Sequence, residues 1–295
     1  MHSFRDQLKK IPCLVRSINI IRSALRQLRT GQLRLLYPEG GYLRCNGIKV
    51  FCDFKDRTYA WYDQNSPHLY NEMRLFEKII DQQPGNVYLD IGAHFGYFSR
   101  IVAQRNIGTD RKLICLEPDK KNFRCLERTM ADLTGKCNFE LMPYAISEHN
   151  GEIKLYGSGL DCLHTYSDSD GRSSVCYKVN SICLDKLVSD RISNDDRIAF
   201  IKIDIDGAEP VVFSGGMETI RKHKPVIFME FSPFVLRKAG VYPEEFFNML
   251  NKEFHVYWYK KYALQKVREK DYSSIEQDVK DGVTDLLLAY SECNY

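Results

Sequence analysis

The chain has 295 residues, of which 44% are hydrophobic and 27% are charged, and its formal net charge is +3. This is the composition of a globular protein with room for one large α/β domain and an extension. The small net charge gives no reason to expect a nucleic-acid partner, and no apolar run approaches the roughly 20 residues that cross a bilayer. The ten cysteines contain no C-x-x-C pair, which favours free thiols and a cytoplasmic location.

The N-terminal part of the chain is basic. Residues 7 to 36 contain seven lysines and arginines and no acid. Between these charges apolar residues recur at helical spacing, so the segment is predicted to form a basic amphipathic helix. Such a helix could cap the domain, lie on an anionic membrane surface, associate with a second copy of the chain, or act as a targeting segment. The sequence leaves these alternatives open.

A hairpin and a helix are predicted to follow this segment. Gly40 and Gly41 end the basic helix, residues 42 to 54 have a strong turn signal at Asn46-Gly47, and residues 70 to 81 return to helical spacing. The aromatic side chains between them are candidates for stacking on a sugar, although such clusters are often plain packing. These aromatic residues are Tyr59, Trp61 and Tyr62.

A strand, a glycine turn and a helix are predicted between Asn86 and Ile101. Residues 87 to 89 are an apolar, strand-forming run, and residues 97 to 103 have helical spacing. The turn between them reads D-x-G-x-x-x-G, from Asp90 to Gly96, whereas dinucleotide sites read G-x-G-x-x-G. A carboxylate stands where a phosphate would be repelled, and this favours a ligand that carries an amino group.

Glu117 follows a second predicted strand, residues 112 to 116, and precedes Pro118 and Asp119. An acid at the tip of this strand is placed to accept both ribose hydroxyls of an adenosine-containing ligand. Asp119 is the predicted N-cap of a helix that runs to about residue 133. The two turns therefore support one another as parts of one ligand site.

The remainder of the chain alternates between strands and helices. Strands are predicted at 139–146, 152–156, 176–183, 198–203, 226–229, 254–259 and 285–290, and helices at 184–188, from Glu209 onward and at 243–252. Residues 157 to 174 have no apolar periodicity and are predicted to form a loop, which in enzymes is often a substrate lid. His164 in this loop could serve as a general base, although a lone loop histidine is usually a solvated surface residue.

Acidic residues are predicted to meet at one edge of the sheet. Asp204, Asp206 and Glu209 follow one core strand, and Glu230 follows the next. The carboxyl ends of parallel strands share an edge, so these acids should lie near the two turns described above. They could bind Mg²⁺ or Ca²⁺, or they could anchor a polyol and the amino group of a cofactor. We favour the second interpretation, without a metal, because no histidine accompanies them at ligand spacing.

Three motifs stand at these predicted strand ends: Asp90-Ile91-Gly92-Ala93, Glu117-Pro118-Asp119 and Lys202-Ile203-Asp204-Ile205-Asp206-Gly207-Ala208-Glu209. They resemble the signatures of the FkbM family of S-adenosylmethionine-dependent methyltransferases, and the resemblance covers about residues 85 to 232. It implies an α/β, Rossmann-like class I methyltransferase fold. That fold has a mostly parallel seven-stranded sheet with helices on both faces, here preceded by a helical and β-hairpin extension.

The chain departs from the family at His94, where Asn is usual. A histidine can still donate a hydrogen bond, with a pH dependence that Asn lacks.

The resemblance implies a division of roles among these residues. S-adenosylmethionine would be bound at its methionine end by Asp90, at its ribose by Glu117 and around its adenine by residues 144 to 146. The further cofactor contacts that it implies are Gly92, Ala93, His94, Gly96, Pro118, Ala145 and Asp204. The implied reaction is O-methylation of a small-molecule or glycan acceptor, such as a sugar or a secondary metabolite. Asp204 is the first candidate for the base or for positioning the acceptor, and Glu209 is the second.

The predicted organisation is a basic extension of residues 1 to 36, a hairpin and helix lid of residues 37 to 84, and a methyltransferase domain of residues 85 to 295.

Two other classes of protein stay in view. A nicotinamide-dependent oxidoreductase is disfavoured because G-x-G-x-x-G is absent after the first strand. A non-catalytic protein would keep the cofactor fold and act through its basic N-terminal helix. A nucleic-acid methyltransferase ranks low because basic residues are concentrated in the extension.

Overall fold

The computed structural model describes residues 29, 31–56, 58–62, 66–157, 164–165, 175–293 and 295. Most of the predicted basic helix, residues 7 to 36, lies outside the described residues; residues 31 to 36 are described and are helical. Most of the predicted loop of residues 157 to 174 also lies outside them, as does the side chain of His164. Within the described part of the chain, no helix has the length and apolar character that a membrane span requires.

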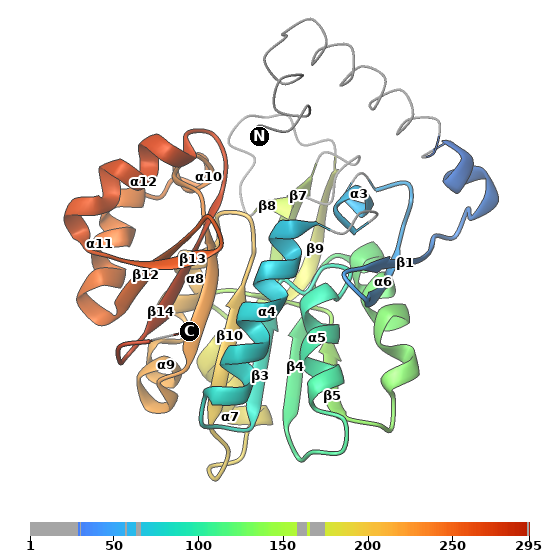
Figure 1. Ribbon diagram of the computed structural model, residues 1–295, viewed down its shortest axis with the longest axis horizontal. Coiled ribbons are helices and arrows are strands. Elements are labelled where there is room, and N and C mark those ends of the chain that lie inside the picture. Colours follow the sequence, from blue (N-terminus) through green and yellow to red (C-terminus); the bar gives the residue numbers. More distant parts are fainter. Residues whose placement is uncertain are drawn as a thin grey trace, which may run out of the picture.

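An eight-stranded sheet forms the centre of the molecule (Figure 1). Its order is β13 (Ala263–Val267), β12 (His255–Lys260), β14 (Thr284–Ala289), β11 (Val226–Phe231), β10 (Ile198–Ile203), β3 (Val87–Ile91), β4 (Lys112–Leu116) and β5 (Asn138–Met142). The five strands from β11 to β5 are parallel, whereas β14, β12 and β13 pair antiparallel. The predicted α/β class with a mostly parallel sheet is confirmed, and β13 adds one strand to the expected seven.

The sheet reverses its chain order between β3 and β10. β4 and β5 lie on one side of β3, whereas β10 and β11 lie on the other. The side chains of β3 are buried throughout and those of β10 nearly so, as expected for parallel strands that are covered on both faces. Open parallel sheets bind ligands at the carboxyl ends of the strands beside such a reversal. The glycine turn after β3 and the acidic turn after β10 therefore meet at this place.

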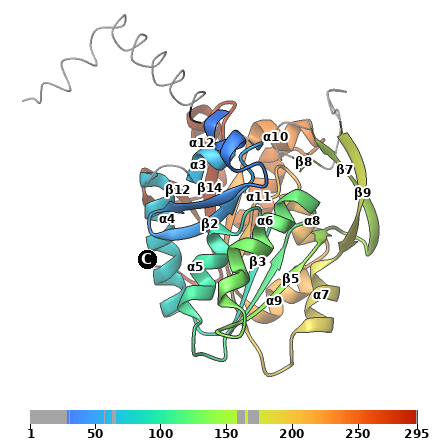
Figure 2. The ribbon, with the colours of Figure 1, turned by 90° about the vertical axis from the view of Figure 1, so that its right-hand side faces the viewer.

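Helices cover both faces of the central sheet (Figures 1 and 2). On one face lie α4 (Pro67–Gln82) and α5 (Tyr97–Arg105). The ring of Phe76 on α4 packs there against the rings of Phe98 and Phe228, with centroids 4.8 and 4.9 Å apart. The other face buries a second apolar cluster beneath α7 (Leu184–Arg191), α8 (Glu209–Ser214), α9 (Met217–His223), α10 (Pro233–Lys238), α11 (Pro243–Glu253) and α12 (Tyr272–Val279). Apolar burial on both faces fixes the strand ends in place.

The predicted hairpin consists of β1 (Gly41–Cys45) and β2 (Ile48–Cys52). Asn46 and Gly47 have φ angles of 51° and 86°, the positive values that a tight two-residue hairpin turn requires. β2 packs against α5 and α6 (Lys120–Met130), and the backbone N–H of Phe51 donates to Thr129 Oγ1 at 2.8 Å. The hairpin leads into the short helix α3 (Tyr59–Tyr62), which is thereby held beside the carboxyl edge of the sheet.

The predicted strand at residues 139 to 146 is in fact two strands in different sheets. β5 ends at Met142, and Pro143 has no backbone N–H to donate to a neighbouring strand. β6 (Tyr144–Ile146) then joins a four-stranded sheet in the order β6, β9 (Val175–Ile182), β7 (Gly151–Gly157) and β8 (His164–Thr165) (Figure 2). The predicted strand of residues 152 to 156 therefore belongs to this second sheet rather than to the central one.

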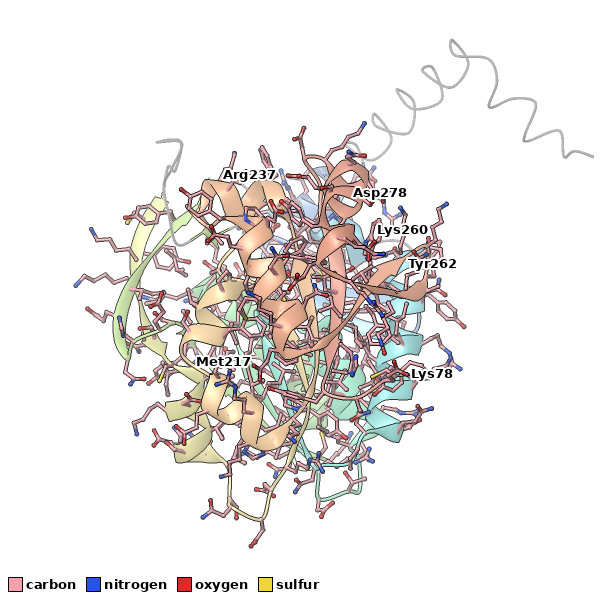
Figure 3. All side chains as sticks on the ribbon, turned by 90° about the vertical axis from the view of Figure 1, so that its left-hand side faces the viewer. Lys78, Met217, Arg237, Lys260, Tyr262 and Asp278 are labelled. Atoms are coloured by element: carbon pink, nitrogen blue, oxygen red, sulfur yellow. The ribbon has the colours of Figure 1, made fainter. Side chains whose placement is uncertain are left out.

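Two elements near the C-terminus, β13 and α12, are not predicted by the sequence. β13 has one buried side chain, Val267, and lacks the apolar pattern of a strand, so its place is set by pairing with β12. Lys260 on β12 and Asp278 on α12 form an ion pair of 2.6 Å, and Figure 3 shows the two side chains on these neighbouring elements. A surface pair of this kind contributes at most about 1 kcal/mol to stability.

Candidate active site

A cavity of about 580 Å³ opens at the carboxyl edge of β3, β4, β10 and β11. Its lining includes the turns after these strands and residues of β6, β7, β14, α3, α4 and α5. Among the described lining residues, Lys202 is the one lysine or arginine, and it faces eight carboxylic acids. The cavity is therefore strongly acidic. These acids are Glu72, Asp90, Glu117, Asp119, Asp204, Asp206, Glu230 and Asp285.

The glycine turn after β3 is held by the neighbouring strand. The backbone N–H groups of Gly92 and Ala93 both donate to the carbonyl of Leu116, at 3.0 and 2.9 Å. Gly92 has a φ of +82°, and a Cβ there would lie 1.9 Å from the backbone oxygen of Asp204. The close approach that demands glycine is thus between the turns after β3 and β10. Gly92 and Ala93 both line the cavity.

Gly96, also a predicted cofactor contact, has a different role in the structure. It has a φ of +86° and is the N-cap of α5. A Cβ at this position would lie 2.7 Å from Leu126, so close packing against α6 explains the glycine. Gly96 does not belong to the lining of the cavity.

Asp90 places a partly unpaired carboxylate at the cavity. One of its oxygens accepts a hydrogen bond from the hydroxyl of Ser99 on α5, and the other, Oδ1, is buried without a partner among the described residues. Burial raises the pKa of Asp90 to about 6, and the neighbouring ammonium of Lys202 opposes that rise. A buried acceptor without a donor is costly, so Oδ1 is suited to a donor that a ligand supplies.

Glu117 is fixed by two backbone groups. The N–H of His94 donates to its Oε2 at 2.8 Å, and the N–H of Asp119 donates to its Oε1 at 2.9 Å. Burial raises the pKa of Glu117 to about 8 despite these donors. Asp119 is the N-cap of α6, as predicted, and accepts from the N–H groups of Lys121 and Asn122 at 2.8 Å each. Glu117, Asp119 and Pro118 all line the cavity.

His94 links the cavity floor to the residues that precede the sheet. Its Nε2 lies 3.2 Å from Thr58 Oγ1, its Nδ1 lies 3.2 Å from the Tyr62 hydroxyl, and its ring stacks on Phe95 with centroids 3.9 Å apart. Burial lowers the pKa of His94 to about 4. The pH dependence that we expect from this histidine therefore falls near pH 4 rather than near neutrality. The sequence does not predict its two hydroxyl partners.

Among the acids of the motif after β10, Asp204 is the most exposed to solvent. Its side chain is 45% exposed, and Oδ2 forms an ion pair of 2.7 Å with Lys202. Burial lowers the pKa of Lys202, but the charges of Asp204 and Asp90 outweigh this and raise it above its usual value. The lysine therefore keeps its charge and orients the Asp204 carboxylate at the cavity. Lys202 belongs to the predicted motif, but the sequence does not single it out for this role.

Glu209, the second candidate for the base, lies outside the cavity lining. Its side chain is 2% exposed, and Oε1 accepts from the backbone N–H groups of Ile205 and Gly207 at 3.3 and 3.2 Å. Glu209 thus stabilises the turn that carries Asp204, and its placement corrects the prediction. Asp206, in contrast, lines the cavity, and burial raises its pKa well above the usual value.

The apolar part of the lining includes several predicted residues. Ala145 on β6 is buried and lines the cavity together with its neighbours Tyr144 and Ile146, where we expect the adenine. Trp61 on α3 lines the mouth with 59% of its surface exposed. Tyr59 is a core residue at 3% exposure, so the stacking prediction does not apply to it.

A histidine lies in the same cavity, beside two acids that are not among the four predicted to meet at this edge. His68 on α4 places Nε2 at 3.2 Å from Glu72 Oε1 and at 3.9 Å from Asp285 Oδ2. All three residues line the cavity. His68 and Glu72 are four residues apart, but the predicted helix begins at residue 70, whereas α4 begins at Pro67 and includes both. Nothing in the sequence links this helix to Asp285.

Comparison with known proteins identifies the family. Residues 90–263, more than half of the chain, match the family described as the methyltransferase FkbM domain. No protein with a curated description matches the chain. Among solved structures, the methyltransferase FkbM from Methylobacillus flagellatus KT is 17% identical with a TM-score of 0.42; the match covers 69% of this chain and 43% of that one. Thus this chain spans less than half of that protein.

Two O-methyltransferase structures are also similar. The enzyme from Bacillus cereus, in complex with SAH, is 16% identical with a TM-score of 0.42, and the match covers 77% of this chain and 82% of that one. TomG from Streptomyces achromogenes, in complex with SAM, is 12% identical with a TM-score of 0.44, covering 80% and 88%. The family itself is shown by the match over residues 90–263. The chain belongs to the FkbM methyltransferase family.

Proposed function

We propose that this protein transfers a methyl group from S-adenosylmethionine to an acceptor hydroxyl. The observation that carries the proposal is the acidic lining of the cavity, where the described residues include eight carboxylic acids and one lysine. S-adenosylmethionine has a sulfonium and an ammonium against one carboxylate, so its net charge is positive and complements these acids. The pyrophosphate of a nicotinamide dinucleotide would be repelled there, which argues against the oxidoreductase alternative.

The placement of Asp90 and Glu117 supports their proposed roles in binding the cofactor. The unpaired Oδ1 of Asp90 would accept from the ammonium of the methionine end. Both oxygens of Glu117 already accept from backbone N–H groups, yet each has a further lone pair for a ribose hydroxyl. Ala93, Pro118 and Ala145 would pack against the nucleoside. His94, kept neutral by its lowered pKa, would hold Thr58 and Tyr62 over the cavity.

The remaining residues are proposed to act on the acceptor. The cofactor supplies a methyl group on a good leaving group, and the sulfur keeps the electron pair of the broken bond while the acceptor oxygen gains the methyl group. Asp204 would take the proton that the acceptor hydroxyl loses, because its open carboxylate is held at the cavity by Lys202. Burial of most of the lining would exclude water and align the reacting atoms.

The acceptor is proposed to be a small polyhydroxyl compound or a glycan. Carboxylates accept hydrogen bonds from several hydroxyls at once, and they line the same cavity as Trp61. The exposed indole of Trp61 at the mouth offers a face on which a sugar ring can stack.

The experiment follows a radiolabelled methyl group from S-adenosylmethionine into an extract of small molecules and glycans. We expect labelled ether products with the wild-type chain and at least about 100-fold less label with Asp204→Asn. Binding of S-adenosylmethionine to Asp204→Asn should stay within about threefold of wild type, because the asparagine keeps an acceptor oxygen for the cofactor and Asp90 and Glu117 remain. Equal labelling by both proteins would contradict the role of Asp204, and no labelled product in any extract would contradict the transfer itself.

A further inference from the structure

Three potential metal ligands converge at the cavity from two elements. His68 and Glu72 lie one turn apart on the same face of α4, and Asp285 faces them from β14. One ligand atom from each residue, a ring nitrogen or a carboxylate oxygen, lies within 4.8 Å of the other two. The sheet and the helix therefore bring together one nitrogen and two oxygen ligands. These residues are called the His68 cluster below.

The surroundings of the His68 cluster contain an unpaired polar group. Tyr259 lies directly opposite Asp285 in the register of β12 and β14, and its ring centroid is 6.3 Å from that of His68. Tyr259 is 6% exposed, and its hydroxyl has no hydrogen-bond partner among the described residues. The ring centroid of Tyr262, an exposed residue labelled in Figure 3, lies 6.5 Å from that of His68. A buried hydroxyl in this position requires a partner such as a bound water.

Charge also points to a cation at this place. The side chains of Glu72 and Asp285 are 12% and 17% exposed, and Glu230 lies opposite Asp285 in the register of β11 and β14. Carboxylates this close repel one another when both are ionised. The one lysine among the described lining residues, Lys202, is paired with Asp204. A divalent cation between the three side chains of the His68 cluster would offset this repulsion.

We propose that the His68 cluster binds a divalent transition-metal ion of the Mn²⁺, Co²⁺ or Zn²⁺ type. One imidazole and two carboxylates suit these ions better than Mg²⁺ or Ca²⁺, which prefer oxygen ligands throughout. Three protein ligands leave coordination positions free, and the three residues line the cavity. A water in one free position could donate a hydrogen bond to the Tyr259 hydroxyl oxygen.

The ion would bind the acceptor rather than the cofactor. This part rests on the proposed function, because it places the acceptor oxygen in the part of the cavity that α4 and β14 line. A cation there would hold that oxygen and ease the loss of its proton, which Asp204 would receive. The substrate class is therefore an oxygen-rich acceptor with a hydroxyl beside a second oxygen ligand, as in a sugar or polyol.

The test is a titration of the chelator-treated, dialysed protein with Mn²⁺, followed by the electron paramagnetic resonance signal of the free ion. We expect about one saturable site per chain, and weakening by at least about tenfold in each of His68→Gln, Glu72→Gln and Asp285→Asn. The matched control is Glu77→Gln, which removes the same charge from α4 at a residue outside the cavity lining and should bind like wild type. The His68 side chain is 54% exposed, so His68→Gln should fold even where a carboxylate variant does not.

Two results would overturn the metal site. One is the absence of saturable Mn²⁺ binding, and the other is binding that Glu72→Gln and His68→Gln leave unchanged. Calorimetric titration with S-adenosylmethionine in the presence of a chelator separates this proposal from the proposed function. Cofactor binding without Mn²⁺ binding would contradict the metal site alone, whereas Mn²⁺ binding without cofactor binding would contradict the proposed function and support the site.

Discussion

Asp90 and Lys202 lie directly opposite one another on the neighbouring strands β3 and β10. Asp90 belongs to the motif that is proposed to bind the cofactor, and Lys202 is paired with Asp204, the first candidate for the base. One ammonium therefore lies between the carboxylates proposed for the two substrates. This relationship joins the two halves of the cavity electrostatically and makes Lys202 the first residue to change.

Replacing Lys202 by methionine should destabilise the protein. The substitution leaves Asp90, which is 1% exposed, without its neighbouring cation, and the free energy of unfolding should fall by about 1–3 kcal/mol at pH 8. The matched control is Lys260→Met, which breaks an ion pair of similar exposure with Asp278 outside the lining of the acidic cavity. Lys260→Met should lower the free energy of unfolding by less than about 1 kcal/mol. Urea denaturation measures the free energy of unfolding of both variants. Equal losses would show that Lys202 does not stabilise the buried carboxylate of Asp90.

Binding of the nucleoside part of the cofactor should strengthen with pH. Burial raises the pKa of Glu117 to about 8, so its carboxyl is largely protonated at lower pH and ionises as the pH rises through 8. The ionised form accepts hydrogen bonds from both ribose hydroxyls, whereas the protonated form has lost an acceptor position. The probe is 5′-methylthioadenosine, which has the ribose and base but no amino acid that titrates.

Its affinity should rise about tenfold between about pH 6.5 and 8.5 by calorimetry. The control for this series is Glu117→Gln, which should bind more weakly and with a flat pH profile. His94 should not contribute, because its pKa is lowered to about 4. A rise of the same size in Glu117→Gln would assign the titration to another group.

Gly92→Ala should lower the free energy of unfolding much more than an alanine substitution at another glycine with a positive φ. A Cβ at Gly92 would lie 1.9 Å from the Asp204 backbone oxygen, so the two turns must separate, at a cost above about 2 kcal/mol. Gly108 also has a positive φ, +73°, but a Cβ there would meet no other part of the chain within 4 Å, and Gly108→Ala should cost about 1 kcal/mol. Thermal unfolding of the two variants checks this, and similar losses would mean that the turns are not in contact.

Glu209→Gln should keep methyl transfer within about threefold of wild type, because a glutamine oxygen can still accept from Ile205 and Gly207. Its effect should differ from that of Asp204→Asn, which removes the proposed base. The assay is the labelled methyl transfer described above. A loss as large as that of Asp204→Asn would restore Glu209 as a catalytic residue.

Apolar runs and capping residues allowed much of the fold to be predicted. The strands at 112–116 and 198–203 and the cap at Asp119 follow from burial and local hydrogen bonding, which adjacent residues determine. β13 could not be predicted because its pairing with β12, and not its own pattern, holds it in the sheet. The division of the chain at residues 36 and 84 stays a prediction.

The site was predictable only in part, for a similar reason. Asp90, Glu117 and Asp204 stand at strand ends, and the topology of a parallel sheet brings such residues together. The spacing of Glu209 does not reveal that its carboxylate turns toward the backbone of its own loop. The meeting of His68 with Asp285 depends on how α4 packs across the sheet, which is long-range information.

The most direct test of the central claim is calorimetric titration of the full chain with S-adenosylmethionine and, separately, with NAD⁺ and NADP⁺. We predict micromolar binding of S-adenosylmethionine, at least about tenfold weaker binding by Asp90→Asn, and no binding of the nicotinamide nucleotides. Binding of a nicotinamide nucleotide in place of S-adenosylmethionine, or no binding of either, would contradict the assignment of this acidic cavity to a cationic methyl donor.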